Sequence, residues 1–258
     1  MTVNRLSVSD IVCAVGKPTV GCLHWRTSQA SVTSLLDNQS GSVIGPLIMS
    51  ELLERGLSAV CIVIGSDESV ITANNTLNTL KSLEAIAQRV QLPVVMYYEH
   101  NDRERKRHEV DEQIHLALGT LAILANRTNR EIDTKDISNW LQFNKTTSIE
   151  PQVACLDIYS DPEKAIEIKN PISIASIYAH EDIPMLSSIP EYHAAGYVRE
   201  PSKDFKQIHY IVGLEGLTNI YKQVKETLEY YYQQRNGRVK QDSILGDDDQ
   251  CTDEGLVL

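Results

Sequence analysis

The sequence has no long hydrophobic run and no apolar segment of the kind that begins a secreted protein. A helix that crosses a membrane needs about 20 consecutive apolar residues, and no run in these 258 residues comes near that length. The first ten residues, MTVNRLSVSD, lack the apolar core of a signal peptide. We therefore expect a cytoplasmic protein without a membrane partner, either free or in a particle assembled in the cytoplasm.

Cysteine is scarce and shows no pairing pattern. The five cysteines are odd in number, and no two of them form a Cys-x-x-Cys pair. This pattern argues against a disulfide framework and against a zinc site. The seven histidines are scattered along the chain, so we expect no metal site.

The chain also lacks an excess of positive charge. Its formal net charge is -11, whereas proteins that bind nucleic acids usually carry a basic face. The one dense basic cluster, NDRERKRHE at 101–109, is diluted by acids and fits a solvated helix face. We expect no direct binding to nucleic acid. Residues 241–258 predict a flexible acidic tail, which could be a partner-binding arm or only a solubilising end.

Strands and helices alternate in the first half of the sequence. Continuous apolar runs at 60–64 and 94–98 are typical of strands buried on both faces of a parallel sheet. A polar loop is expected at 65–75, a helix at 76–90 and a long helix at 103–127. The order predicts an α/β fold, with a parallel sheet and helices on both faces. Ligands of such sheets bind beyond the carboxyl ends of the strands.

The second half has shorter strands and helices, which predicts a smaller α+β domain. We place the domains at 1–128 and 129–240, before the tail. Residues 187–204, which include two prolines and a glycine, predict a long loop, and loops of this length are often functional.

Two aspartates, Asp133 and Asp136, stand three apart in the stretch REIDTKDISNWL. Asp133 or Thr134 would cap a helix that begins here, and Asp136 would favour its first turn. Carboxylates beside a phosphate can instead orient or deprotonate an attacking water. The residues alone leave both roles open.

Taken in order, these parts resemble the tubulin/FtsZ superfamily, above all its divergent phage and plasmid branch. The stretch SGSVIGPLIMSELLERG at 40–56 is similar to the family's glycine-rich phosphate loop and the helix after it. YEHNDRE is similar to the family's Asn-Asp loop, and NREIDTKDIS to the loop with two spaced acids after the central helix. The resemblance covers about residues 31–235.

The resemblance implies a tubulin-like α/β fold with a central helix followed by the smaller α+β domain. It also implies GTP and magnesium as ligands, and filaments in which the acidic loop of one subunit enters the nucleotide site of the next. The residues that it implies for nucleotide binding are Ser40, Gly41, Ser42 and Asn101, the last against the guanine base. Those that it implies for catalysis are Asp133 and Asp136.

The sequence also departs from the family pattern near its start. Only 38 residues precede the phosphate-loop match, and they contain no clustered glycines. Asn38 and Gln39 stand where the family has glycines, and Glu131 stands where it has an asparagine. We therefore expect a shortened, degenerate nucleotide site that binds GTP weakly or not at all.

Three functions follow from these observations. The first, which we prefer on sequence alone, is a non-enzymatic tubulin-like assembly subunit without a cofactor, which could be phage-encoded and built into a virion. Its partners would be copies of itself or other structural subunits. The second is an active GTPase whose filaments position DNA or phage particles in the host cytoplasm. The third is an unrelated α/β enzyme or binding domain.

Overall fold

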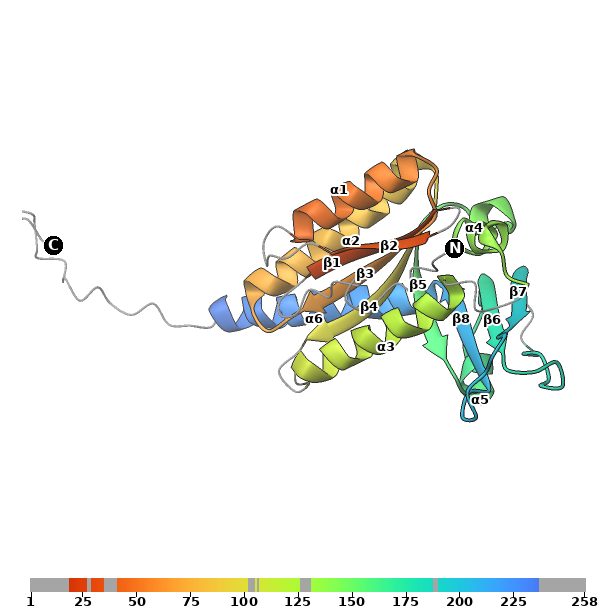
Figure 1. Cartoon of the computed structure of the whole chain (residues 1–258). Coiled ribbons are helices and arrows are strands. Elements are labelled where there is room, and N and C mark those ends of the chain that lie inside the picture. The colour runs from red at the N-terminus through yellow and green to blue at the C-terminus, as the bar shows by residue number, and fades with distance from the viewer. Residues whose placement is uncertain are drawn as a thin grey trace, which may run out of the picture.

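One mixed β-sheet runs through the described part of the chain (Figure 1). The computed structural model describes residues 19–26, 29–34, 41–101, 105, 107–125, 131–187 and 190–236. Within them the strand order is β2-β1-β3-β4-β5-β8-β6-β7. The strands are β1 (Thr19–Arg26), β2 (Gln29–Ser34), β3 (Ala59–Ser66), β4 (Val94–Asn101), β5 (Val153–Tyr159), β6 (Ser173–Tyr178), β7 (Tyr192–Tyr197) and β8 (Gln207–Gly213).

The centre of the sheet is parallel, as the apolar runs predict. β4 pairs in parallel with β3 on one side and with β5 on the other. All eight residues of β3 are buried, which is why this strand has no polar alternation. The prediction of a parallel sheet does not extend to its flanks. β1 is antiparallel to β2 and β3, and β8 is antiparallel to β5 and β6.

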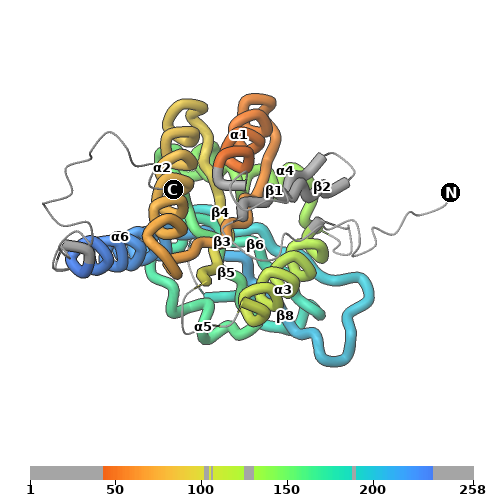
Figure 2. Tube along the Cα trace, turned by 90° about the vertical axis from the view of Figure 1, so that its left-hand side faces the viewer, coloured from red at the N-terminus to blue at the C-terminus, as the bar shows by residue number. Residues whose placement is uncertain are grey.

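Helices cover both faces of this sheet, as predicted. One face packs against α1, α2 and α6, and the other against α3 and α4. Figure 2 shows α2 and α3 on opposite sides of β3 and β4. No helix in the described part of the chain combines the length and the apolar character needed to cross a membrane. The helices are α1 (Gly41–Glu54), α2 (Val70–Val90), α3 (Arg107–Ala125), α4 (Thr134–Leu141), α5 (Pro162–Ile166) and α6 (Glu215–Asn236).

The sheet is continuous across the two predicted domains because β5 pairs with strands of both halves. The predicted boundary after residue 128 lies outside the described residues, and so does the predicted acidic tail. The domain division and the flexibility of the tail stay predictions.

The loop predicted at 65–75 is wrong at both ends, because β3 continues to Ser66 and α2 already begins at Val70. Ser69 caps the helix: its hydroxyl accepts from the Thr72 N–H at 3.2 Å, and the Thr72 hydroxyl accepts from the Ser69 N–H at 3.0 Å. Ala73, in the next turn, is fully buried against α6. This tertiary contact and the reciprocal cap stabilise a polar segment as a helix.

The loop predicted at 187–204 is also wrong, since it contains the edge strand β7. β7 pairs in parallel with β6 along its whole length, from Ser173 opposite Tyr192 to Tyr178 opposite Tyr197. The sequence YHAAGY contains no β-branched residue, so its local preference for a strand is weak. We attribute the strand to its backbone hydrogen bonds with β6.

A line of three polar side chains crosses β7, β6 and β8 beside this edge. The Ser176 hydroxyl lies 2.9 Å from His193 Nε2 and 2.9 Å from His209 Nδ1. One hydroxyl proton can satisfy only one of the two rings, so the other ring must donate an N–H to the serine oxygen. This hydrogen-bonding pattern is complete when both histidine rings are neutral. Burial, reinforced by His193, lowers the pKa of His209 to about 4, and burial also lowers the pKa of His193.

We predict that this pair makes the fold sensitive to acid. A histidine whose pKa is lowered on folding binds its proton more readily in the unfolded chain, so stability is retained above pH about 6.5 and is lost as the pH falls toward about 4. His209→Asn keeps a hydrogen-bonding side chain but removes the titrating ring. The free energy of unfolding, measured with urea, should fall between pH 7 and pH 4 in both proteins. The fall should be smaller in this variant than in the native chain by about 2 kcal/mol. Parallel pH profiles of the two proteins would contradict this account.

Candidate functional site

Asn101 lies at the carboxyl end of the parallel strands. It is the last residue of β4, opposite Ser66 of β3, and is only 3% exposed. Its Oδ1 has no hydrogen-bond donor among the described residues. A buried amide oxygen without a donor is costly. Asn101 Oδ1 is therefore a buried acceptor that still lacks a partner among the described residues.

A polar network surrounds this strand end and ties it to α6. The Asp67 N–H donates to the Asn101 carbonyl at 3.3 Å. Tyr98 Oη lies 2.7 Å from His100 Nδ1, and His100 Nε2 lies 3.2 Å from Asp67 Oδ1, off line for a hydrogen bond. The Thr227 hydroxyl of α6 donates to the other Asp67 oxygen at 3.1 Å. The loop after β3, the end of β4 and α6 thus share one set of side chains.

Two ion pairs flank the same end of the sheet. Arg107, at the start of α3, lies 2.7 Å from Glu68, in the loop after β3. Arg105 lies 2.6 Å from Glu99 of β4. Partly exposed ion pairs add little stability, whereas guanidinium groups bind phosphate well. A phosphate at this end of the strands would have to compete with Glu68 and Glu99 for these two guanidinium groups.

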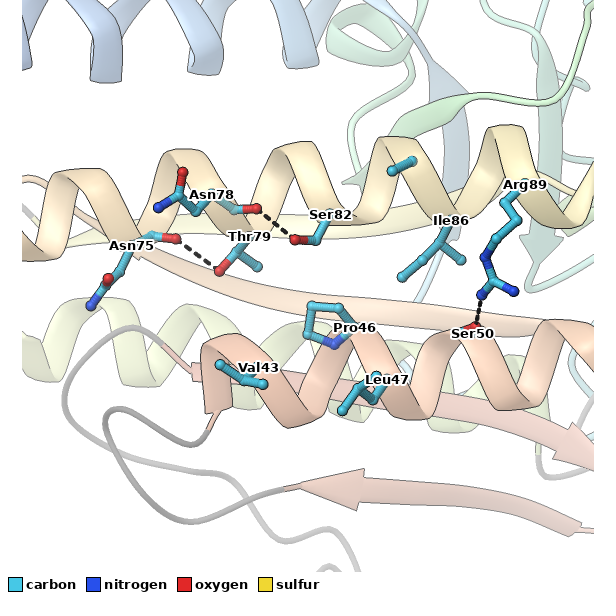
Figure 3. A pocket seen from close by; sticks show the side chains of 11 residues that line it. Val43, Pro46, Leu47, Ser50, Asn75, Asn78, Thr79, Ser82, Ile86 and Arg89 are labelled. Carbon is cyan, nitrogen blue, oxygen red and sulfur yellow. Dashed lines mark hydrogen bonds between the residues drawn. The ribbon is translucent and has the colours of Figure 1, made fainter.

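The segment similar to a phosphate loop leads to this end of the molecule as well. Ser40 lies outside the described residues, while Gly41 and Ser42 form the first turn of α1, where only the backbone is described. α1 and α2 lie side by side and run in the same direction, with Val43 near Asn75 and Ser50 bonded to Arg89 (Figure 3). Because α2 starts at the carboxyl end of β3, α1 starts at that end too.

A groove of about 470 Å³ separates α1 from α2 (Figure 3). Val43 and Leu47 line one wall and are more than half exposed, and Asn75, Asn78 and Arg89 line the other. None of the predicted site residues lies in it. The described residues also contain no group of three or more His, Cys, Asp or Glu side chains that could hold a metal ion.

Asp133 and Asp136 form the amino-terminal cap of α4. Asp133 Oδ1 accepts from the N–H groups of Lys135 at 2.7 Å and Asp136 at 3.0 Å. Asp136 Oδ2 accepts in return from the Asp133 N–H at 3.1 Å. The capping role that the sequence left open is therefore real. Capping leaves one oxygen of Asp133 available for another role, because Asp133 is exposed and its Oδ2 takes part in no bond with the described residues.

The cap also fixes the charge of Asp133. Hydrogen bonds from the backbone N–H of Asp136 and then of Lys135 lower the pKa of the Asp133 carboxyl. A carboxylate that is held ionised accepts hydrogen bonds well but is a weak base. Asp133 is thus better suited to orient a water molecule than to take its proton.

The acidic pair and Asn101 lie at opposite ends of the sheet. α4 is fixed at the amino end of β3, where the Ser58 hydroxyl donates to Ser138 of α4 at 3.1 Å. Asn101 is at the carboxyl end of β4, which has eight residues and so spans about 26 Å. Figure 1 shows the same arrangement, with α4 beyond one end of the strands and the starts of α2 and α3 at the other. Within one chain the two groups of predicted residues do not meet.

Several neighbours of these residues were not predicted. Asp67 lies in the segment GSDESV, which the rule for carboxyl ends of strands marks as a ligand-binding region, so this residue could have been found. The contacts of Tyr192 and Gly196 with residues 131–136, the acidic segment, could not have been found, because they depend on the unpredicted strand β7.

A family model described as "Phage tubulin-like protein, C-terminal domain" matches residues 132–215. A phage tubulin-like protein of Pseudomonas phage phiKZ is 33% identical over 219 residues, which cover 85% of this chain and 67% of the relative. A phage tubulin-like protein of Pseudomonas phage PhiPA3 is 31% identical over 232 residues, which cover 86% and 72%.

Solved structures agree with these relatives. The structure described as a protofilament of TubZ from bacteriophage PhiKZ is 32% identical, has a TM-score of 0.79 and matches over 84% of this chain and 69% of that one. The match includes the mixed sheet with helices on both faces, which confirms the tubulin-like α/β fold. The chain belongs to the family of phage tubulin-like proteins, a divergent branch of the tubulin/FtsZ superfamily.

Proposed function

We propose that the chain is a subunit of head-to-tail filaments that bind and hydrolyse GTP at the contact between subunits. One observation carries this proposal: the ligand-binding end and the acidic end lie about 26 Å apart on opposite ends of one sheet. A translation along the strands brings the acidic end of one copy to the ligand-binding end of the next. Such a heterologous contact repeats without closing and produces a filament.

A guanine nucleotide fits the described groups at the carboxyl end of β4. The unsatisfied Asn101 Oδ1 would accept from the N–H groups of guanine. The backbone N–H groups at the start of α1 would hold phosphate oxygens, since a helix N-terminus favours anions. The structure described as the phage tubulin PhuZ with GDP, 27% identical to this chain with a TM-score of 0.79, supports a nucleotide at this fold.

The acidic pair would act on the nucleotide of the neighbouring subunit. Asp133 keeps its charge, and its Oδ2 points to no described partner. This oxygen could orient the attacking water beside the terminal phosphate of GTP, and positioning of that kind supplies much of the catalysis in phosphoryl transfer. Asp136 supports the geometry by capping Asp133.

The relatives favour this function over the non-enzymatic assembly subunit that the sequence alone suggests. Relatives of this chain have been described as a protofilament and as the "PhuZ201 filament". The descriptions of these relatives mention neither a virion nor a degenerate nucleotide site. The third hypothesis, an unrelated α/β enzyme, is wrong because the chain belongs to the tubulin-like family.

Asn101→Ala should weaken GTP binding and reduce the preference for GTP over ATP. Loss of one buried acceptor for guanine predicts an affinity lower by about tenfold. Calorimetric titration with each nucleotide and magnesium measures both effects. Asn78→Ala, on the exposed side of α2, is the control, and an unchanged preference in Asn101→Ala would exclude this residue from base recognition.

Asp133→Asn combined with Asp136→Asn should abolish most turnover while leaving the fold and assembly intact. Asparagine caps helices as well as aspartate does, so α4 should persist. The loss of two carboxylates should slow GTP hydrolysis on the order of 100-fold. Phosphate release and light scattering, followed in the same sample, separate turnover from assembly.

The matched control for this double variant is Asp161→Asn. Asp161 caps α5 by accepting from the Glu163 N–H at 3.0 Å, and it lies outside the acidic segment. Turnover should stay native in this control. Native turnover in the double variant as well would leave the acidic pair with a capping role only.

A further inference from the structure

The edge strand β7 contacts the acidic segment at three points. Glu131 Oε2 accepts from the Tyr197 N–H at 2.8 Å, and Asp136 Oδ1 accepts from the Tyr192 hydroxyl at 3.1 Å. Between these bonds, Ile132 packs onto Gly196. The two ends of a six-residue strand therefore hold the segment on both sides of Asp133.

The contact at Gly196 leaves little room for a side chain. A Cβ atom there would lie 3.0 Å from Ile132 Cγ1 and 3.3 Å from the Ile132 backbone nitrogen. Side-chain atoms can yield at such distances, but the backbone yields less readily. Glycine thus lets the acidic segment lie directly on the strand.

The Tyr197 N–H points to the open side of the sheet, because its neighbour Val198 supplies the bond to β6 through the Tyr178 carbonyl at 2.9 Å. An edge strand leaves every second N–H without a ladder partner. Glu131 fills one of these positions with a charge-assisted bond. β7 itself is fixed to the inner sheet by its ladder and by the bond of His193 to Ser176.

We propose that β7 positions the acidic segment, with Glu131, Tyr192 and Gly196 as positioning residues that act through Asp133 and Asp136. The inference rests on the proposed function, since it assigns how those carboxylates are aimed at a neighbouring subunit. Glu131 stands at the position where the family has an asparagine. Its carboxylate is bound to β7, so it orients the segment and does not act on the nucleotide.

The test compares Glu131→Gln with Glu131→Ala. Glutamine retains an oxygen that accepts from the Tyr197 N–H, so its turnover at saturating GTP should stay within about twofold of native. Alanine loses the bond, and turnover should fall about tenfold, since small displacements of a reacting group have large effects on rate. Tyr192→Phe should act in the same direction. GTP affinity should be unchanged in all three variants, because the nucleotide end is about 26 Å away within the chain.

Glu191→Ala is the matched control. Glu191 also accepts from a backbone N–H, that of Ser148 at 2.6 Å, and it lies just before β7, but it ties the strand to the loop after α4. It should leave turnover native. Hydrogen exchange without nucleotide provides an independent measure: the Tyr197 amide should exchange slowly in the native chain and in Glu131→Gln, and fast in Glu131→Ala.

Three results would overturn the inference. Equal losses of turnover in Glu131→Gln and Glu131→Ala would show that the charge of Glu131 itself acts in the reaction. Native turnover in both Glu131→Ala and Tyr192→Phe would show that the contacts with β7 are unnecessary. A further loss when Glu131→Ala is added to the Asp133→Asn, Asp136→Asn variant would show that Glu131 does not act through the pair. Absence of turnover in the native chain would instead remove the proposed function.

Discussion

The two hydrogen-bonded ladders on β5 hold the molecule together as one body. β5 joins the parallel strands β3 and β4 on one side to the antiparallel strand β8 on the other. Every proposed functional group is placed relative to this continuous sheet. Asn101 ends one of its strands, α4 packs at the opposite end, and β7 forms its far edge. A stiff sheet keeps the two ends of the subunit at a fixed separation.

This fixed separation explains how one chain can carry both halves of a reaction and complete neither alone. The nucleotide-binding groups and the acidic pair would meet only when subunits stack. Hydrolysis would then depend on assembly, since the carboxylates that orient water belong to the next copy. The helix cap does not compete with this role. It uses one oxygen of Asp133, holds the carboxylate ionised and leaves the second oxygen exposed.

The sequence predicted the parts of the fold that depend on local pattern. The apolar runs at 60–64 and 94–98 lie in β3 and β4, because strands buried on both faces need no polar alternation. The helical period predicted α2 but missed its beginning at 70–75, since this part depends on the cap at Ser69 and on packing against α6. β7 was missed because its stability comes from pairing with β6 and not from its own residues.

For the candidate site as well, the sequence predicted what depends on local spacing and not the contacts between distant residues. The spacing of Asp133 and Asp136 predicted both a cap and a catalytic pair, and the cap is what the folded chain shows directly. Asn101 was expected in a loop, whereas it ends a strand and is buried with an unsatisfied oxygen. The network of Asp67 with α6 joins residues 160 positions apart, and no local pattern reports such a contact.

A shared site can be tested most directly by mixing two impaired subunits, at a GTP concentration far below the Kd of Asn101→Ala. Asn101→Ala lacks the base contact but keeps the acids, and the Asp133→Asn, Asp136→Asn variant has the opposite defect. In a random head-to-tail polymer about one contact in four pairs an intact Asn101 with intact acids. If the site is shared between subunits, an equimolar mixture should recover about a quarter of native GTP turnover. A rate no higher than the mean of the two separate variants would contradict a site shared between subunits.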